Sequence, residues 1–277
     1  MDSYFLVYST DRCPSNAHFR LHDHDGYEIF LFLEGDTNYI IEENTYTLNP
    51  GDIILVRNKQ MHQTYHNRPV RYSRINISLF PFFFSENHCE KYETSFLPGA
   101  YHKGSKISAD VANSSGLSDA FMRLQKYSDN FTQKDSPIVI ATLIEILYLI
   151  HNVKNYSFAE NTNSQIKAVI TYINKNFTAP ITLETLEKEF FLSKYYLCHS
   201  FSKATGLTIH QYITNKRLIL ANDMIKGGKD IHLAAELSGF NSYSAFYRAY
   251  VNKYHLSPQQ LRNHPGPILT LPPIIEH

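Results

Sequence analysis

The sequence predicts a two-domain α+β protein, with a β-rich N-terminal domain that carries some helices and an all-α C-terminal domain. The chain has 277 residues, and protein domains commonly contain about 100–200 residues. Short apolar segments separated by turn residues fill the first third of the chain, which is typical of a β-sandwich or barrel. Beyond about residue 105, apolar residues recur at the three- and four-residue spacing of helices.

Short β-strands are expected between residues 4 and 84. The segment 27–33 is aromatic and apolar and is followed by a turn at Gly35. The turn at 49–52 contains proline, which fixes φ, and glycine, which tolerates positive φ. Further strands are predicted at 38–42, 46–48, 53–56, 63–66 and 71–79.

Two helices are expected to complete the N-terminal domain, at about 117–127 and at 138–153. The second is apolar nearly all round, so it should be buried, either in the core of its own domain or against a partner subunit. A polar segment without periodicity follows and indicates a linker. The expected boundaries are 1–155 for the N-terminal domain, 156–164 for the linker, 165–264 for the helical domain and 265–277 for a Pro-rich tail.

The helical domain contains an internal repeat. Leu197 and Phe201 recur as Phe246 and Tyr250, 49 residues later. In each copy a turn of three or four residues separates two helices, which is helix-turn-helix geometry. The two units are expected at about 182–205 and 230–254, with helix-capping residues at Thr182, Ser193, Thr208 and Ser257.

The second helix of each unit has a polar face opposite its apolar stripe. Leu197, Phe201 and Ala204 are expected to be buried in the first unit. The opposite faces carry groups that can contact base edges or phosphates, as a recognition helix requires: Tyr195, Cys198, His199 and Ser202 in the first, and Tyr243, Ser244, Tyr247 and Arg248 in the second. Two helical hairpins in an all-α domain without DNA binding are the alternative.

The formal charge of the whole chain is zero, but it is divided unevenly. Residues 165–264 carry 12 Lys and Arg against 6 Asp and Glu, a net +6, whereas residues 1–164 carry 14 against 19, a net −5. A basic C-terminal half fits a nucleic-acid partner. Because +6 is modest, non-specific DNA binding should be weak and strongly salt-dependent.

Several other protein classes are disfavoured. The three cysteines (Cys13, Cys89 and Cys198) are widely spaced, so neither a disulfide framework nor a cysteine zinc site is expected. The start lacks the features of a signal peptide, and the longest apolar run, 138–150, is too short to span a bilayer. A cytoplasmic protein without a membrane segment is expected. There is no phosphate loop or nucleophile elbow, so neither an enzyme nor a cofactor is expected.

Motifs throughout 165–264 resemble the AraC/XylS family of transcription regulators. They are Ile181-Thr182-Leu183-Glu184, Leu192-Ser193, Tyr196-Leu197, Thr205-Gly206, Arg217-Leu218, Gly239-Phe240 and Ser257-Pro258. The resemblance implies two helix-turn-helix units joined by a long helix, at about 208–226, that enter adjacent major-groove segments of double-stranded DNA. The sequence departs from the family pattern at three positions. Glu187 replaces a small residue, Tyr250 replaces phenylalanine, and His255 replaces glycine.

Arg248 is the strongest candidate for reading a base, because arginine pairs bidentately with guanine O6 and N7. A phosphate contact is the alternative role for this residue. The first recognition helix, with Tyr195, Cys198 and His199, should read thymine methyls and DNA shape more than it forms strong hydrogen bonds. Lys194 and Lys203 either contact the phosphate backbone of DNA or are ordinary solvated lysines.

His22-x-His24-x-x-x-Glu28, followed by Gly35, Pro50-Gly51-Asp52 and His62, resembles the cupin barrel. In metal cupins this pattern supplies three histidines and a glutamate, and imidazole with carboxylate suits Fe, Mn, Ni or Zn. His22 and His24 would share one face of a strand. Arg57, Lys59 and His66 depart from the second cupin motif. The alternatives are a ligand pocket or a structural network. Phe30, Phe32, Arg74 and Asn76 are further pocket candidates, with core packing or surface exposure as their alternative roles.

The resemblance implies a ligand-responsive transcription regulator. In this family the barrel binds a small-molecule effector, often a sugar, activation is the commoner mode, RNA polymerase is a partner, and a helix equivalent to 138–153 forms the homodimer. The alternatives are a metal-dependent cupin enzyme fused to a DNA-binding domain, and a regulator without a small ligand.

Overall fold

The computed structural model describes residues 3–16, 19, 21–97, 105–130, 137–154 and 164–263. Of the predicted linker only its last residue, Ser164, is described, and the predicted tail lies outside the described residues. The described residues form two compact units, one containing most of residues 3–154 and the other containing residues 164–263. Each unit is described by itself.

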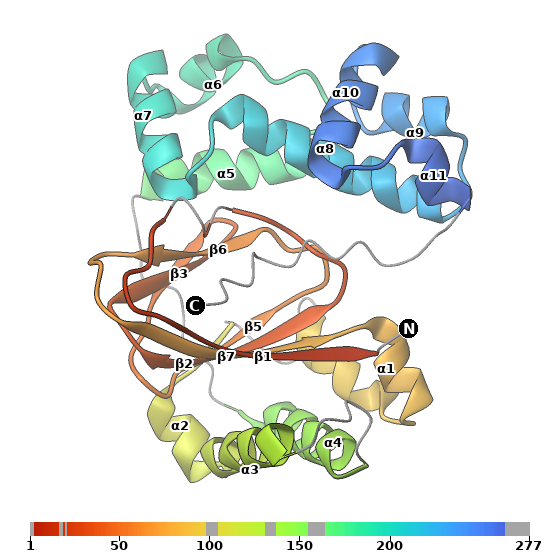
Figure 1. Cartoon of the computed structure of the whole chain (residues 1–277). Coiled ribbons are helices and arrows are strands. Elements are labelled where there is room, and N and C mark those ends of the chain that lie inside the picture. The colour runs from red at the N-terminus through yellow and green to blue at the C-terminus, as the bar shows by residue number, and fades with distance from the viewer. Residues whose placement is uncertain are drawn as a thin grey trace. The chain divides into compact units, whose positions relative to one another are not determined.

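The N-terminal unit is built from two antiparallel sheets that face each other (Figure 1). The larger sheet has the strand order β1-β7-β2-β5-β8, and the smaller has the order β4-β3-β6. The predicted strands are present within two residues of their expected bounds, and the turn between β3 and β4 lies at 42–43. The strands are β1 (Tyr4–Asp11), β2 (Tyr27–Glu34), β3 (Thr37–Ile41), β4 (Asn44–Thr47), β5 (Ile53–Val56), β6 (His62–His66), β7 (Tyr72–Leu79) and β8 (Lys106–Ile107).

Strands β2, β5 and β7 of the larger sheet are buried on both faces. Successive side chains along a strand point to opposite faces, so each of these strands contributes to two layers of core. Ile29 and Leu31 of β2 pack with the helices of this unit, whereas Phe30 and Phe32 pack between the two sheets. The helices lie on one side of the larger sheet (Figure 1). They are α1 (Pro81–Glu86), the 3₁₀ helix η1 (Glu90–Phe96), α2 (Ala109–Ser114), α3 (Leu117–Asn130) and α4 (Pro137–Asn152).

Helix α4 contributes one face to the core of its own domain. Leu143, Ile146 and Ile150 are at most 1% exposed and pack with the sheet and α3. The opposite face leaves Ile138 and Tyr148 exposed. Of the two alternatives for this helix, burial in the core of its own domain is therefore correct for one face.

The C-terminal unit is helical throughout the residues that the structure describes. Its helices are α5 (Ser164–Asn176), α6 (Leu183–Phe190), α7 (Lys194–Thr205), α8 (Ile209–Lys226), α9 (Ile231–Leu237), α10 (Tyr243–Tyr254) and α11 (Pro258–Asn263). Helices α6 and α7 form one helix-turn-helix unit and α9 and α10 the other, with the long α8 between them in the chain (Figure 1).

The helix starts follow the capping chemistry that the sequence predicts. Thr208 and Gln211 form a reciprocal capping box at α8. The hydroxyl of Ser193 accepts from the backbone N–H of Tyr196 at α7. Such caps satisfy backbone donors that a helix start leaves unpaired. At the end of α10, His255 adopts φ +57°, the left-handed region that explains why the family pattern has glycine there.

Candidate nucleic-acid interface and barrel cavity

Helix α7 exposes the polar face that the sequence predicts. Leu197 and Phe201 are fully buried, whereas Tyr195 is 80% exposed and Cys198, His199 and Lys203 are exposed. The rings of Tyr195 and His199, one turn apart, are parallel with centroids 6.1 Å apart. Ser202 is half-buried. The expectation for Ala204 is wrong in part: it is half-buried, and Thr205 is the fully buried residue at this end of the helix.

Thr205 is buried although it is polar, because its hydroxyl has partners inside the protein. Its Oγ1 donates to the carbonyl of Phe201 at 2.9 Å and accepts from the backbone N–H of Leu207 at 3.2 Å. A hydroxyl satisfied in this way can be buried at low cost.

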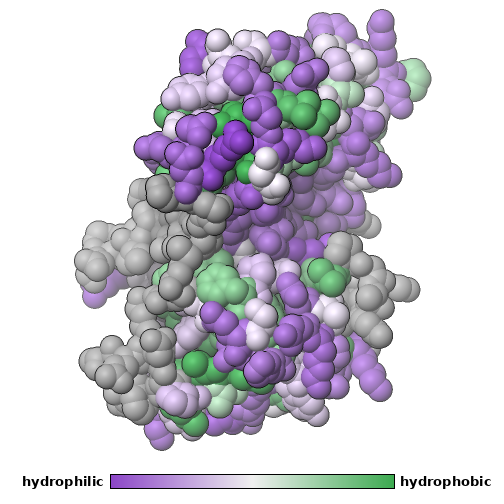
Figure 2. Space-filling view, turned by 90° about the vertical axis from the view of Figure 1, so that its right-hand side faces the viewer, coloured by the Kyte–Doolittle hydropathy of each residue, from purple (hydrophilic) through white to green (hydrophobic). Residues whose placement is uncertain are grey.

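Helix α10 presents the second polar face. Phe246 and Tyr250 are fully buried, and the exposed residues are Tyr243, Ser244, Tyr247 and Arg248. The Arg248 Nε donates to the carbonyl of Ser244 at 3.3 Å, and its side chain remains at the surface. The C-terminal unit shows a largely hydrophilic surface around a smaller hydrophobic area in Figure 2.

Two features near these faces were not predicted. The ring of His232 on α9 stacks on Tyr243 with centroids 3.9 Å apart, a contact that sequence periodicity cannot indicate. Lys194 pairs with Glu184 of α6. The hydrogen bond from Lys194 lowers the pKa of Glu184 to about 2, and this contact also raises the pKa of Lys194.

The three histidines of the barrel motif converge although they come from separate segments. His22 and His24 precede β2, and His22 forms an isolated backbone bridge to His62 of β6. One ring nitrogen of each lies within 4.8 Å of the others. His22 and His24 direct their rings to the same site, as expected for one strand face. They are not part of a regular strand, because only His22 forms an isolated bridge.

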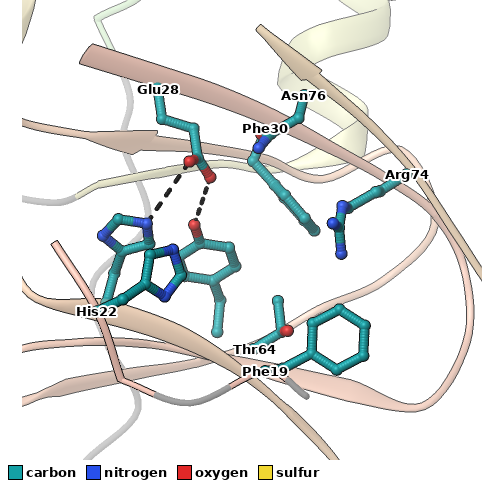
Figure 3. A pocket seen from close by; sticks show the side chains of 9 residues that line it. Phe19, His22, Glu28, Phe30, Thr64, Arg74 and Asn76 are labelled. Atoms are coloured by element: carbon teal, nitrogen blue, oxygen red, sulfur yellow. Dashed lines mark hydrogen bonds and ion pairs between the residues drawn. The ribbon is translucent and has the colours of Figure 1, made fainter. Parts of the chain in front are cut away.

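Glu28 of β2 is the centre of a buried polar network (Figure 3). Its Oε1 accepts from the hydroxyl of Tyr39 at 2.6 Å, and its Oε2 lies 3.0 Å from His24 Nε2 and 3.5 Å from His62 Nε2. Burial alone would raise the pKa of Glu28, but the charge of His62 and the hydrogen bond from His24 outweigh it and hold this pKa well below its usual value.

A small cavity opens between the two sheets beside this network. It offers about 30 Å³ to the centres of water-sized groups, and one water needs about 10–15 Å³ by this measure. The cavity therefore has room for two or three such groups. It is lined by Phe19, His22, Glu28, Phe30, Tyr39, His62, Thr64, Arg74 and Asn76.

The cavity contains most of the predicted pocket residues. His24 contacts Glu28 but does not line the cavity, and Phe32 packs against Tyr72 instead. Tyr39 and Thr64 were not predicted. They face each other in the β3–β6 pairing, and such long-range register is not visible in local sequence.

Arg74 of β7 is buried, so its alternative role as a surface residue is wrong. Its side chain is 7% exposed, and its Nη1 donates to the hydroxyl of Tyr72 at 3.1 Å. The guanidinium carbon lies 5.3 Å from the ring centroid of Phe19. Burial and the nearby charge of Arg74 lower the pKa of His66 to about 4, so that imidazole is neutral near pH 7.

Two family models match the chain. One for an "AraC-like ligand binding domain" matches residues 5–124, and one for a "Helix-turn-helix domain" matches residues 186–264. None of the helices that the structure describes is long and apolar enough to cross a membrane.

Several known proteins are similar over nearly the whole chain. The "Msm operon regulatory protein" of Streptococcus mutans is 25% identical, with 92% of this chain and 90% of that protein covered. The "HTH-type transcriptional activator RhaS" of Escherichia coli O81 is 21% identical, with 89% and 88% covered. The solved structure of ToxT from Vibrio cholerae is 14% identical, with 97% of this chain and 96% of that chain covered, and has a TM-score of 0.38. The matched ligand-binding and helix-turn-helix models, in the order that the motifs predicted, show that the chain belongs to the AraC/XylS family of transcription regulators.

Proposed function

We propose that this regulator is an activator that binds operator DNA through α7 and α10 and responds to a small polar molecule in the barrel cavity. The observation that supports DNA binding best is the exposure of two recognition-helix faces above fully buried apolar stripes. Activation is suggested by the relative named a transcriptional activator. An activator of this kind acts in the cytoplasm and contacts RNA polymerase. No enzymatic step is part of this proposal.

We expect α10 to read bases by hydrogen bonding and α7 to read DNA mainly by apolar contact and shape. Arg248 is exposed on α10 and suits guanine. On α7, the stacked rings of Tyr195 and His199 present apolar surface, which suits thymine methyl groups. Tyr243, Ser244, Tyr247, Cys198 and Ser202 complete the two faces, with Lys194 and Lys203 as phosphate contacts.

Replacing Arg248 by alanine should cost about 1–3 kcal/mol of DNA-binding free energy and relax specificity at one base position. The operator would first be identified by selecting tight binders from random duplexes. Affinities would then be measured by fluorescence anisotropy on the operator and on all single-base variants. Arg262→Ala is the matched control, because Arg262 is an exposed arginine on α11 outside the recognition helices. An equal loss on every duplex would assign Arg248 to a phosphate.

We propose that the protein acts as a homodimer through the exposed face of α4. Ile138 is 40% exposed and Tyr148 is 51% exposed on this helix. These side chains lie opposite the face that packs in the domain core. The face therefore provides apolar surface that a second copy would bury.

Metal binding is the second candidate function of the barrel, because three imidazoles converge there. His22, His24 and His62 suit a transition metal. Glu28 fits less well as a fourth ligand, since Tyr39 and His24 already hold its two oxygens. Bound metal would supply Lewis-acid chemistry or rigidity at this site.

We expect the purified protein to hold much less than one transition metal per chain after expression in metal-supplemented medium. Mass spectrometry of the elements would be run on the wild type and on His62→Ala. The matched control is His210→Ala, which removes an exposed histidine at the start of α8. A stoichiometric metal that disappears only in His62→Ala would favour the metal-dependent alternative.

A further inference from the structure

Arg74 and Asn76 each bring a buried polar atom without a partner to the cavity. Arg74 Nε and Asn76 Oδ1 are inaccessible to solvent and make no hydrogen bond with any residue that the structure describes. Both residues are on β7, two positions apart, so they point to the same face of the sheet. Both line the cavity (Figure 3). One is a donor and the other an acceptor.

The charge of Arg74 has no direct ionic partner within the described part of the barrel, although the charge of Glu28 acts on it from farther away. Its polar contact there is the hydroxyl of Tyr72, and no carboxylate of the described residues forms an ion pair with it. Glu28 is opposite Ser78 and Arg74 is opposite Phe32 in the β2–β7 register. Glu28 and Arg74 are therefore offset by four residues along the strand direction, which is about 13 Å. In Figure 3, Phe30 lies between them.

A buried guanidinium without an ionic partner is stabilised when an anion binds beside it. Arginine remains protonated in proteins, and burying an unpaired charge is strongly unfavourable. The aromatic rings of Phe19 and Tyr72 near the guanidinium supply only partial compensation. An anionic ligand would complete the site.

We propose that the effector is a 2-hydroxycarboxylate, a class that runs from lactate to the aldonic sugar acids. Its carboxylate accepts from Arg74 Nε, and its neighbouring hydroxyl donates to Asn76 Oδ1. The cavity holds two or three water-sized groups, which matches a carboxylate oxygen pair with an adjacent hydroxyl. The methyl group of lactate would contact Phe19 or Phe30, and the longer carbon chain of an aldonic acid would extend out of the cavity. This inference rests on the proposed role of the cavity as the effector site.

The test compares ligands that differ in one group, by thermal unfolding of the full-length protein. L-lactate, D-lactate and D-gluconate are each used at 10 mM. Propionate lacks the hydroxyl, 1,2-propanediol and D-glucitol lack the carboxylate, and inorganic phosphate is a different anion. We expect at least one hydroxy acid to raise the Tm by about 3 °C or more. Propionate should act more weakly, and the neutral compounds and phosphate should have no effect.

Two variants test the assigned contacts. Arg74→Gln should weaken hydroxy-acid binding about tenfold to a hundredfold, while Arg71→Gln, an exposed control immediately before β7, should not. Asn76→Val should weaken hydroxy-acid binding but leave propionate binding unchanged, which remains informative if Arg74→Gln does not fold. A cooperative thermal unfolding transition of the N-terminal unit without ligand would show that the barrel of each variant is folded.

Other outcomes overturn the proposal. The first is stabilisation of the protein by a neutral sugar alcohol or by phosphate to the same extent as by the acids. The second is an unchanged Tm with every acid of the panel. The third is undiminished hydroxy-acid binding by folded Arg74→Gln. The first of these would leave a ligand-responsive regulator with a different effector. If the wild-type protein selected no duplex from the random pool, that result would instead count against the proposed function itself.

Discussion

Replacing Gly239 by alanine is expected to destabilise the C-terminal unit by about 3 kcal/mol or more. Gly239 follows α9 and has φ +94°, where an L side chain costs about 1–3 kcal/mol of strain. A β-carbon there would also lie 2.4 Å from the carbonyl oxygen of Thr178 and 2.9 Å from its Cα. Those are backbone atoms, so no side-chain rotation can relieve the overlap, and such overpacking adds about 1–3 kcal/mol.

Gly228→Ala separates strain from overlap. Gly228 has a similar φ of +83°, but a β-carbon there meets no atom within 4 Å. Gly228→Ala should therefore lower the free energy of unfolding only by the backbone strain, about 1 kcal/mol. Urea unfolding gives the free energies, and amide hydrogen exchange over 209–254 shows whether the loss is local. Equal destabilisation by the two substitutions would mean that contact with Thr178 is not what restricts residue 239.

The C-terminal unit could be predicted well because its signals are local. A capping residue and its partner are three positions apart, as at Thr208 and Gln211, and an apolar stripe repeats every turn. The bounds and buried faces of α7 and α10 follow from these signals. Burial of Thr205 could not be predicted in this way, because it depends on the loop that returns past the helix end.

The barrel was less predictable because its site is assembled by long-range pairing. Strand bounds followed from alternation and turns, and the family pattern identified His22, Glu28 and His62. The positions of Tyr39 and Thr64 depend on the β3–β6 register, which single strands do not encode. Arg74 has the same parity as buried Tyr72. That parity indicates an inward side chain, but charged side chains are rarely buried inside small barrels. The sequence therefore left surface exposure as an alternative.

Replacing Glu28 by alanine should destabilise the N-terminal unit by about 3 kcal/mol near pH 6. The substitution removes the acceptor of the Tyr39 hydroxyl and the partner of His24. Tyr39 is 2% exposed and His24 is 9% exposed, so bulk solvent does not reach either group. Each buried polar group left unsatisfied costs about 1–3 kcal/mol.

The penalty for Glu28→Ala should depend on pH because His24 titrates in this range. Burial alone would lower the pKa of His24, but the hydrogen bond and charge of Glu28 outweigh it and raise this pKa above 6.5. A group with a raised folded-state pKa stabilises fully below its unfolded pKa, and this contribution is lost as the pH rises through the folded value. Glu28→Ala should therefore cost more at pH 6 than at pH 8.

Glu34→Ala is the control for this experiment, since Glu34 is on the same strand but exposed. Its carboxylate is 3.4 Å from Arg71, and both side chains are more than half exposed. Such surface pairs contribute about 0–1 kcal/mol, so little loss and little change between pH 6 and pH 8 are expected. A Glu28→Ala penalty as small as that of Glu34→Ala, or one equal at both pH values, would show that the ionised Glu28–His24 pair does not stabilise the barrel.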